Sequence, residues 1–211
     1  MNKLILLFFA FITISLTLNA QQKLSTINSK KEIAILFIGN SLTYTNNLPK
    51  LVKKEAKKNG VKVNTNMVAF PNYAIMDHWI DGKIQNLITS KKYDYVIIQQ
   101  GPSSQPEGRK ILIEYGTKLY ELCKKNNTKL SYFMVWPSLK YYHTFDGVIK
   151  TYTDAATINN AILIPVGKIW KDYFDKSNNF QYYGPDGFHP SMKGSKIAAK
   201  AIVERLIHKE K

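Results

Sequence analysis

The chain has 211 residues and carries 30 lysines and arginines against 15 aspartates and glutamates, a formal net charge of +15. Arginine is present only as Arg109 and Arg205, and the lysines occur mostly as scattered doublets, which argues against a specific nucleic-acid reader. We therefore expect solvated lysine faces, with loose attraction to anionic polymers as a side effect. The one cysteine, Cys123, lies in a helical pattern and is expected to be a buried thiol, so no intramolecular disulfide can form.

The N-terminal segment has the pattern of a secretory signal peptide. Lys3 precedes an apolar run from Leu4 to Leu18, and the small residue Ala20 marks the expected cleavage region. The run is shorter than the about 20 residues that cross a bilayer, so we expect no stable membrane anchor and an exported mature chain, periplasmic or secreted. The expected organisation is a signal peptide at 1–20, a polar segment at 21–31 and one domain at 32–211.

Apolar runs and helical patterns alternate along the rest of the chain. Strands are expected at 33–38, 61–68, 93–98, 129–136 and 162–164. Helices are expected at 48–58, 76–90, 107–125, 146–159, 166–173 and 192–208. Near-continuous apolar strands that alternate with helices are typical of a parallel sheet covered on both faces. The predicted fold class is α/β, a three-layer α/β/α sandwich with a central parallel sheet of about five strands.

The first candidate site is the turn Gly39-Asn40-Ser41, which follows the first apolar run. In open α/β sheets, ligands bind at the carboxyl ends of the strands, where a serine can be exposed on a rigid backbone. Gly39 would allow a tight turn, and Asn40 tolerates unusual backbone angles. Most serines in this position only cap the next helix, so the turn alone does not indicate a nucleophile.

The second candidate site lies just before the last predicted helix. Asp186 and His189 are three residues apart in a loop rich in glycine and proline, and Ser191 is a good N-cap for the helix that follows. A carboxylate at this spacing can hold one imidazole nitrogen, which leaves the other to accept a proton from a serine. The alternative is a turn-forming aspartate beside a histidine that is merely packed.

Taken together, the two ends of the domain resemble the SGNH branch of the GDSL-type esterases and lipases. Gly39-Asn40-Ser41 is similar to the first block of that family, and Asp186-Gly187-Phe188-His189-Pro190 is similar to the last. The resemblance implies the flavodoxin-like SGNH hydrolase fold and a catalytic triad of Ser41, Asp186 and His189. It is nearest to secreted bacterial members, many of which act on acylated carbohydrates.

The middle blocks depart from the family pattern, so the oxyanion hole is less well defined. The family usually has a glycine after the second strand, whereas this chain has Asn72, whose backbone N–H could still donate. The family also has an asparagine after the third strand, and Gln99, Gln100 or Ser103 are the candidates to replace it here. The backbone N–H of Ser41 would be the remaining donor, and the loss of one donor can cost roughly 10²–10³ in rate.

Other candidates have weaker support. Tyr44 and His143 are candidate substrate contacts, while His78 is expected to be structural. No histidine has the spacing of a metal ligand set, so neither a metal nor a cofactor is expected. Aromatic residues near the loops would suit stacking on sugar rings or, equally well, packing at the bases of the loops.

The sequence therefore predicts an exported serine esterase. The resemblance alone implies the substrate, a small-molecule or glycan ester with a short acyl group, for example acetyl on carbohydrate. One alternative is a catalytically impaired glycan-binding domain that kept the fold, and another is a polyanion-binding protein. Ester or thioester preference and the oligomeric state are left open, and no specific nucleic-acid partner is expected.

Overall fold

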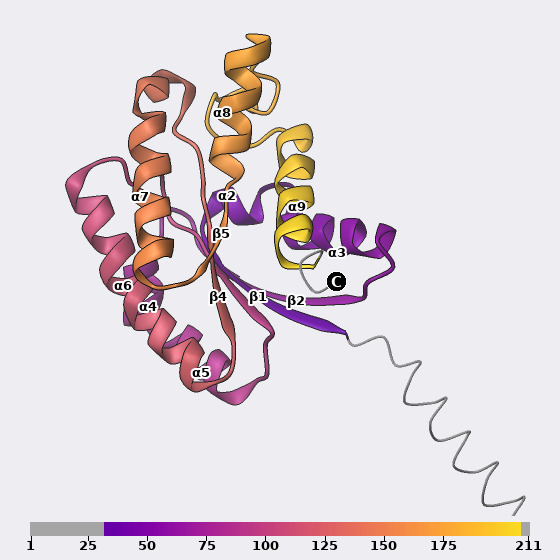
Figure 1. The fold of residues 1–211 in the computed structure, drawn as a ribbon, viewed down its shortest axis with the longest axis vertical. Helices are drawn as coiled ribbons and strands as arrows, with labels where there is room; N and C mark the ends of the chain where they lie inside the picture. Colours follow the sequence, from indigo (N-terminus) through magenta and orange to yellow (C-terminus); the bar gives the residue numbers. More distant parts are fainter. Residues whose placement is uncertain (1–31, 208–211) are drawn as a thin grey trace, which may run out of the picture. The chain divides into compact units, whose positions relative to one another are not determined.

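A computed structural model describes residues 32–207, and its centre is a five-stranded parallel sheet in the order β2-β1-β3-β4-β5 (Figure 1). The strands are β1 (Ile33–Gly39), β2 (Val63–Ala69), β3 (Tyr95–Ile98), β4 (Lys129–Phe133) and β5 (Ile162–Ile164). Each neighbouring pair is parallel, which confirms the predicted fold class. The predicted signal peptide, the polar segment and His208 lie outside the described residues.

Helices cover both faces of the sheet. They are α2 (Ser41–Tyr44), α3 (Leu48–Lys58), α4 (Ile75–Asp81), α5 (Lys83–Ser90), α6 (Pro106–Lys125), α7 (Phe145–Ile158), α8 (Val166–Ser177) and α9 (Met192–Leu206), with 3-10 turns η1 (Thr45–Asn47) and η2 (Leu139–Thr144). Helices α3 and α9 pack against each other on one side, and α4 to α7 form the layer on the other (Figure 1). In residues 32–207, no helix is both long and apolar enough to cross a membrane.

Most elements agree with the expectation to within a few residues, and three differences bear on the site or the core. The helix predicted over 76–90 is two helices, because Gly82 has a φ of +73° and ends α4. The fourth strand ends at Phe133, three residues early, and Trp136 instead packs inside the core. A single helical turn, α2, begins at Ser41 itself, which is too short for a hydrophobic period to reveal.

The core is built on the central strands and a stack of aromatic rings. Strands β1 and β3 are buried almost throughout, as their continuous apolar sequences predict. The indoles of Trp136 and Trp170 stack with ring centroids 3.5 Å apart and an interplanar angle of 14°. Cys123 is fully buried as expected, and burial raises the pKa of its thiol to about 12, so it is not a reactive nucleophile.

The strand register brings the candidate residues to one edge of the sheet. Gly39 is level with Ala69 on β2, and Ile38 is level with Ile98 on β3. Because the strands are parallel, the loops that leave β1, β2 and β3 meet at this edge. From β1 the chain first adds β2 on one side and then β3 on the other, so the strand order reverses between β1 and β3. In this sheet order, ligands bind in the crevice that such a switch point forms.

Candidate active site

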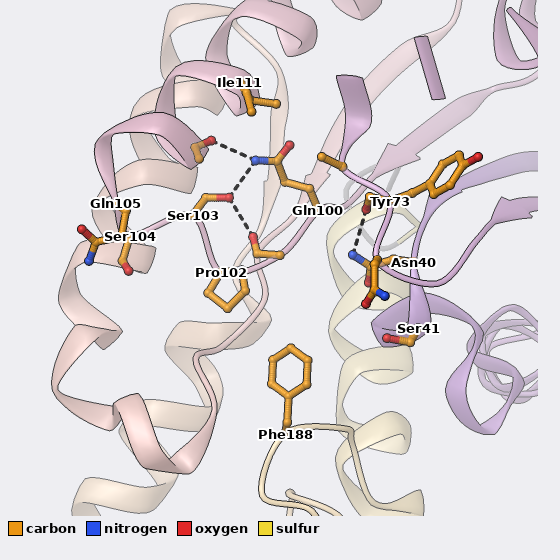
Figure 2. A pocket seen from close by; sticks show the side chains of 14 residues that line it. Asn40, Ser41, Tyr73, Gln100, Pro102, Ser103, Ser104, Gln105, Ile111 and Phe188 are labelled. Carbon is orange, nitrogen blue, oxygen red and sulfur yellow. Dashed lines mark hydrogen bonds between the residues drawn. The ribbon is translucent and has the colours of Figure 1, made fainter. Parts of the chain in front are cut away.

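The turn that carries Ser41 is held by its two preceding residues. Asn40 is the N-cap of α2, and its side-chain oxygen accepts a hydrogen bond from the backbone N–H of Leu42. The same side chain donates to the carbonyl oxygen of Tyr73 at 3.0 Å, which ties the turn to the loop after β2 (Figure 2). Gly39 is required for space and not for an unusual φ, because a Cβ there would lie 2.4 Å from Thr43 Oγ1.

Gln99 clamps this turn to the end of β3. Its side-chain oxygen accepts from the backbone N–H of Asn40 at 3.0 Å and from Thr43 Oγ1 at 2.8 Å. Its side-chain nitrogen donates to Asn40 Oδ1 at 3.0 Å and to the carbonyl oxygen of Gln100 at 2.6 Å. Gln99 is fully buried and does not line the cavity described below, so the expectation that it donates to an oxyanion is wrong.

His78 supports the same turn from α4. Its Nε2 donates to the carbonyl oxygen of Gly39 at 2.8 Å, and its ring contacts the rings of Phe70 and Tyr73. Burial lowers the pKa of His78, and this outweighs the opposing effects of the Gly39 carbonyl, Asp81 and Asp77. The residue is therefore a neutral structural histidine, as expected.

Asp186 and His189 form the pair that their spacing predicts. Asp186 Oδ2 lies 2.5 Å from His189 Nδ1, while Oδ1 accepts from the backbone N–H groups of Phe188 at 3.0 Å and His189 at 2.9 Å. These hydrogen bonds lower the pKa of Asp186, and the one from the His189 side chain has the largest effect. The carboxylate is therefore charged at neutral pH. Nδ1 therefore carries the proton, and Nε2 is left as an acceptor.

The loop that presents His189 is fixed by the core beneath it. The buried indole of Trp136 donates to the carbonyl oxygen of Phe188 at 2.9 Å, so Trp136 positions this loop and is not a platform for sugar stacking. Pro190 and Tyr183 form an isolated antiparallel bridge, and the carbonyl oxygen of Pro190 accepts from Asn46 at 2.9 Å. Because Asn46 follows Ser41 by five residues, this bond joins the serine segment to the histidine loop.

Ser41 borders a cavity of about 420 Å³ at the switch point (Figure 2). The lining comes from four loops and the start of α6: Asn40, Ser41, Asn72, Tyr73, Ala74, Gln100, Gly101, Pro102, Ser103, Ser104, Gln105, Gly108, Ile111 and Phe188. Phe188, which precedes His189, thus shares one cavity with Ser41. In residues 32–207 the Ser41 hydroxyl has no hydrogen-bond partner, and it is partly exposed to the cavity.

Two backbone N–H groups fit the role of oxyanion donors better than the side chains do. Asn72 has a φ of +62°, the left-handed conformation that glycine favours and asparagine tolerates, which explains how it can replace a glycine. Over the described range, the backbone N–H groups of Ser41 and Asn72 make no hydrogen bond. By contrast, Gln100 Nε2 donates to Ser103 Oγ at 2.7 Å and to Gly108 O at 2.9 Å, and Ser103 donates to Gly101 O at 2.8 Å.

The candidate substrate contacts Tyr44 and His143 do not line this cavity. His143 is exposed on η2, and its ring contacts Tyr141. Tyr141 lines an adjoining cavity of about 490 Å³, which shares Pro102, Ser104, Gln105 and Phe188 with the first. Tyr141 is one of the aromatic residues near the loops for which the sequence allows sugar stacking or packing equally, because a loop position gives no sign of which ring faces a cavity. Across residues 32–207, no three His, Cys, Asp or Glu side chains are grouped as metal ligands would be.

Comparison with known proteins gives a consistent result for the fold. No protein-family model and no curated protein matches this chain. Among solved structures, a protein assigned to the SGNH hydrolases from Slackia heliotrinireducens matches with a TM-score of 0.69 at 21% identity, over 83% of this chain and 99% of that one. A lipase/acylhydrolase from Enterococcus faecalis matches with a TM-score of 0.66 at 18% identity, over 84% of this chain and 96% of that one.

A mutant of an acetyl-xylooligosaccharide esterase from Geobacillus matches with a TM-score of 0.65 at 16% identity, over 84% of this chain and 96% of that one. The class defined by the sheet order and its switch point is a flavodoxin-like α/β protein. Within that class, the chain has the fold of the SGNH and GDSL-type hydrolases, as its first and last motifs predict.

Proposed function

We propose that this chain is an exported serine esterase that hydrolyses carboxylic esters through an acyl-enzyme on Ser41. The single observation that carries the proposal is the hydrogen bond of 2.5 Å between Asp186 and His189 on a loop that borders the Ser41 cavity. Fold alone would not support an activity, because one fold serves many functions. Export rests on the sequence pattern of residues 1–20.

In the proposed reaction, His189 Nε2 accepts the Ser41 proton as the hydroxyl attacks the ester carbonyl. The charged carboxylate of Asp186 fixes the tautomer of His189 and stabilises the imidazolium that forms. The protonated His189 then gives its proton to the leaving alcohol. In the second half, His189 removes a proton from a water molecule as that water attacks the acyl group, and it returns the proton to the Ser41 oxygen as the acid leaves. Ser41 and His189 are not hydrogen-bonded in this structure, and such contacts commonly tighten only when substrate is bound.

The negative charge on the carbonyl oxygen would be stabilised by the backbone N–H groups of Ser41 and Asn72. Both groups are free of partners among the described residues and belong to loops that line the same cavity. Gln100 and Ser103 would instead shape the wall opposite the serine, because their own donors are already used within the loop after β3.

The expected substrate is an ester with a short acyl group, and acetyl on carbohydrate is the leading case. Likeness to an acetyl-xylooligosaccharide esterase supports this choice, together with an uncharged cavity lining that combines polar side chains with apolar ones such as Pro102, Ile111 and Phe188. No charged side chain among the lining residues would bind a carboxylate or a phosphate on the acyl part.

The test is turnover of p-nitrophenyl acetate by the mature protein, beside the variants Ser41→Ala and His189→Ala. We expect both variants to lose activity by about 10³-fold or more while their thermal unfolding is unchanged. A folded wild-type protein without turnover would contradict the proposal and would favour the glycan-binding domain named above as the alternative.

A further inference from the structure

The positive charge of the chain is distributed unevenly among its helices. On α7 and α8, most lysines pair with carboxylates four residues away, as in Lys150–Asp154 at 2.8 Å and Lys168–Asp172 at 2.6 Å. On α6, Lys118 pairs with Glu114 at 2.9 Å, while the exposed Lys110, Lys124 and Lys125 have no carboxylate within 4.0 Å among the described residues. Helices α3 and α9 together carry the largest set of exposed lysines: Lys50, Lys53, Lys54, Lys57, Lys58, Lys193, Lys196 and Lys200. Of these, only Lys58 and Lys200 lie within 4.0 Å of a carboxylate in the described part of the chain.

The lysines of the two helices meet in a groove. Because α3 and α9 pack side by side (Figure 1), Lys54 and Lys58 from α3 and Lys196 from α9 line one groove of about 250 Å³. Its other lining residues are Leu51, Glu55 and Ala199. Because Glu55 is paired with Lys58 at 2.5 Å, the unpaired positive charges of the groove are those of Lys54 on α3 and Lys196 on α9. An anionic group in this groove would therefore be attracted from both sides.

This basic face begins at the edge of the sheet that carries the proposed site. Helix α3 starts at Leu48, seven residues after Ser41, and α9 starts at Met192, three residues after His189. Asn46, which lies between Ser41 and α3, also donates to Ser195 Oγ on α9 at 3.0 Å. A polymer lying along α3 and α9 would therefore extend from the loops that hold both residues.

We propose that the α3–α9 face binds an acidic polysaccharide, such as a polymer of uronic acid residues, and so holds an ester-bearing chain beside Ser41. This rests on the proposed function, in so far as the polymer is taken to carry the ester. A nucleic acid is disfavoured, because neither helix has an aromatic residue for stacking and Arg205, whose Nε donates to Leu163 O, is only partly exposed. A membrane surface is disfavoured because Met192 is the one exposed large hydrophobic residue on the described parts of these helices.

The test measures binding of unesterified polygalacturonate, so that it does not depend on ester turnover. We compare the mature protein with the triple variant K54Q/K58Q/K196Q and with the control K110Q/K124Q/K125Q. The control removes the same charge from exposed lysines of α6. We expect the first variant to bind at least about tenfold more weakly and the control to change less than about twofold, and binding of the wild type should weaken as salt is raised.

Several outcomes would overturn this inference. Equal weakening in both variants would show that binding depends only on the overall charge of the protein. Absence of polygalacturonate binding at low salt would also overturn it, and so would tighter binding to anionic lipid vesicles or single-stranded DNA than to polygalacturonate. Thermal unfolding confirms that each variant is folded. If p-nitrophenyl acetate is not hydrolysed but polygalacturonate still binds at this face, the proposed function fails while the binding surface stands.

Discussion

Asn72 has a backbone conformation that few residues other than glycine adopt, at the point where the loop after β2 faces Ser41. Its left-handed φ of +62° leaves its N–H without a partner in the described chain and next to the cavity. The contribution of this residue should therefore come from its backbone, and the side chain should matter only through the conformation that it permits.

Replacement of Asn72 separates these two contributions. We expect Asn72→Gly to keep kcat within about threefold, because glycine adopts this φ without strain. We expect Asn72→Val to lower kcat by about 10²-fold, since a β-branched residue resists this conformation and would displace the N–H. Esterase kinetics on the two variants provide the measurement. A large loss in Asn72→Gly would show that the side chain itself is needed.

His78 should make the stability of the protein depend on pH in the mildly acidic range. Burial lowers its pKa in the folded state, so the unfolded chain binds more protons as the pH falls below the ordinary value of about 6.5. The contribution of His78 to the free energy of unfolding is therefore fully present above about pH 6.5, and it is lost as the pH falls toward the lower pKa of the folded state. Asp77 and Asp81 oppose the shift but do not cancel it.

We expect the urea midpoint of the wild type to fall between about pH 7 and pH 5, and His78→Gln to show a smaller fall over the same range. The exposed His143 serves as the control, since His143→Gln should leave the slope of the wild type unchanged. Identical pH slopes in the wild type and in His78→Gln would rule out a buried neutral histidine at this position.

The turn between β1 and α2 is the element on which the proposed chemistry depends most. Gln99 closes it with three hydrogen bonds, to Asn40 and Thr43, and Gly39 permits the close approach, since a Cβ there would also lie 2.5 Å from Gln99 Oε1. Buried partners satisfy the backbone N–H and side chain of Asn40 and the hydroxyl of Thr43, and we expect this to hold the element rigid.

Gln99→Met tests this element with a side chain of similar size that cannot form hydrogen bonds. It leaves the Asn40 N–H and the Thr43 hydroxyl unpaired in the core, so we expect a loss of roughly 2–4 kcal/mol in the free energy of unfolding. We also expect kcat to fall by about 10-fold to 100-fold, because Ser41 is no longer held in place. Gln85→Met is the matched control, since the Gln85 side chain makes a single hydrogen bond among the described residues, to Trp79 O, and none to this turn. Equal losses in both variants would mean that Gln99 has no special role.

Periodic elements were predictable from the sequence, while elements defined by single residues were not. The bounds of α3 agree with the expected helix at 48–58, α6 begins one residue earlier than expected, and α7 begins and ends one residue earlier. The break at Gly82 and the 3-10 turn η2 were missed, because a glycine inside a helical pattern is usually tolerated and a single turn has no period.

For the whole molecule, the sequence predicted the parallel sheet and the edge at which its loops meet, but not how the side chains there are used. Parallel strands place their carboxyl ends together, so the meeting of the loops after β1, β2 and β3 follows from topology. The His189 loop joins α8 to α9, and the bond from Asn46 to the carbonyl oxygen of Pro190 is what joins it to the Ser41 segment. The roles of the glutamines could not be predicted from the sequence, because they are adjacent residues of one type. Only the structure shows that the Gln99 amide bonds to the Ser41 turn and the Gln100 amide to the loop after β3. The same is true of the lysines, because the unpaired charge of α3 and α9 becomes one surface only when the two helices pack.

The central claim is that Ser41 is a nucleophile activated by His189, and covalent labelling tests it most directly. The mature protein is incubated with a fluorophosphonate, and the modified peptide is identified by mass spectrometry. We predict one adduct, on Ser41, with labelling abolished in Ser41→Ala and slowed by about 10²-fold or more in His189→Ala. A folded wild-type protein that is not labelled, or an adduct on another residue that persists in Ser41→Ala, would contradict the claim.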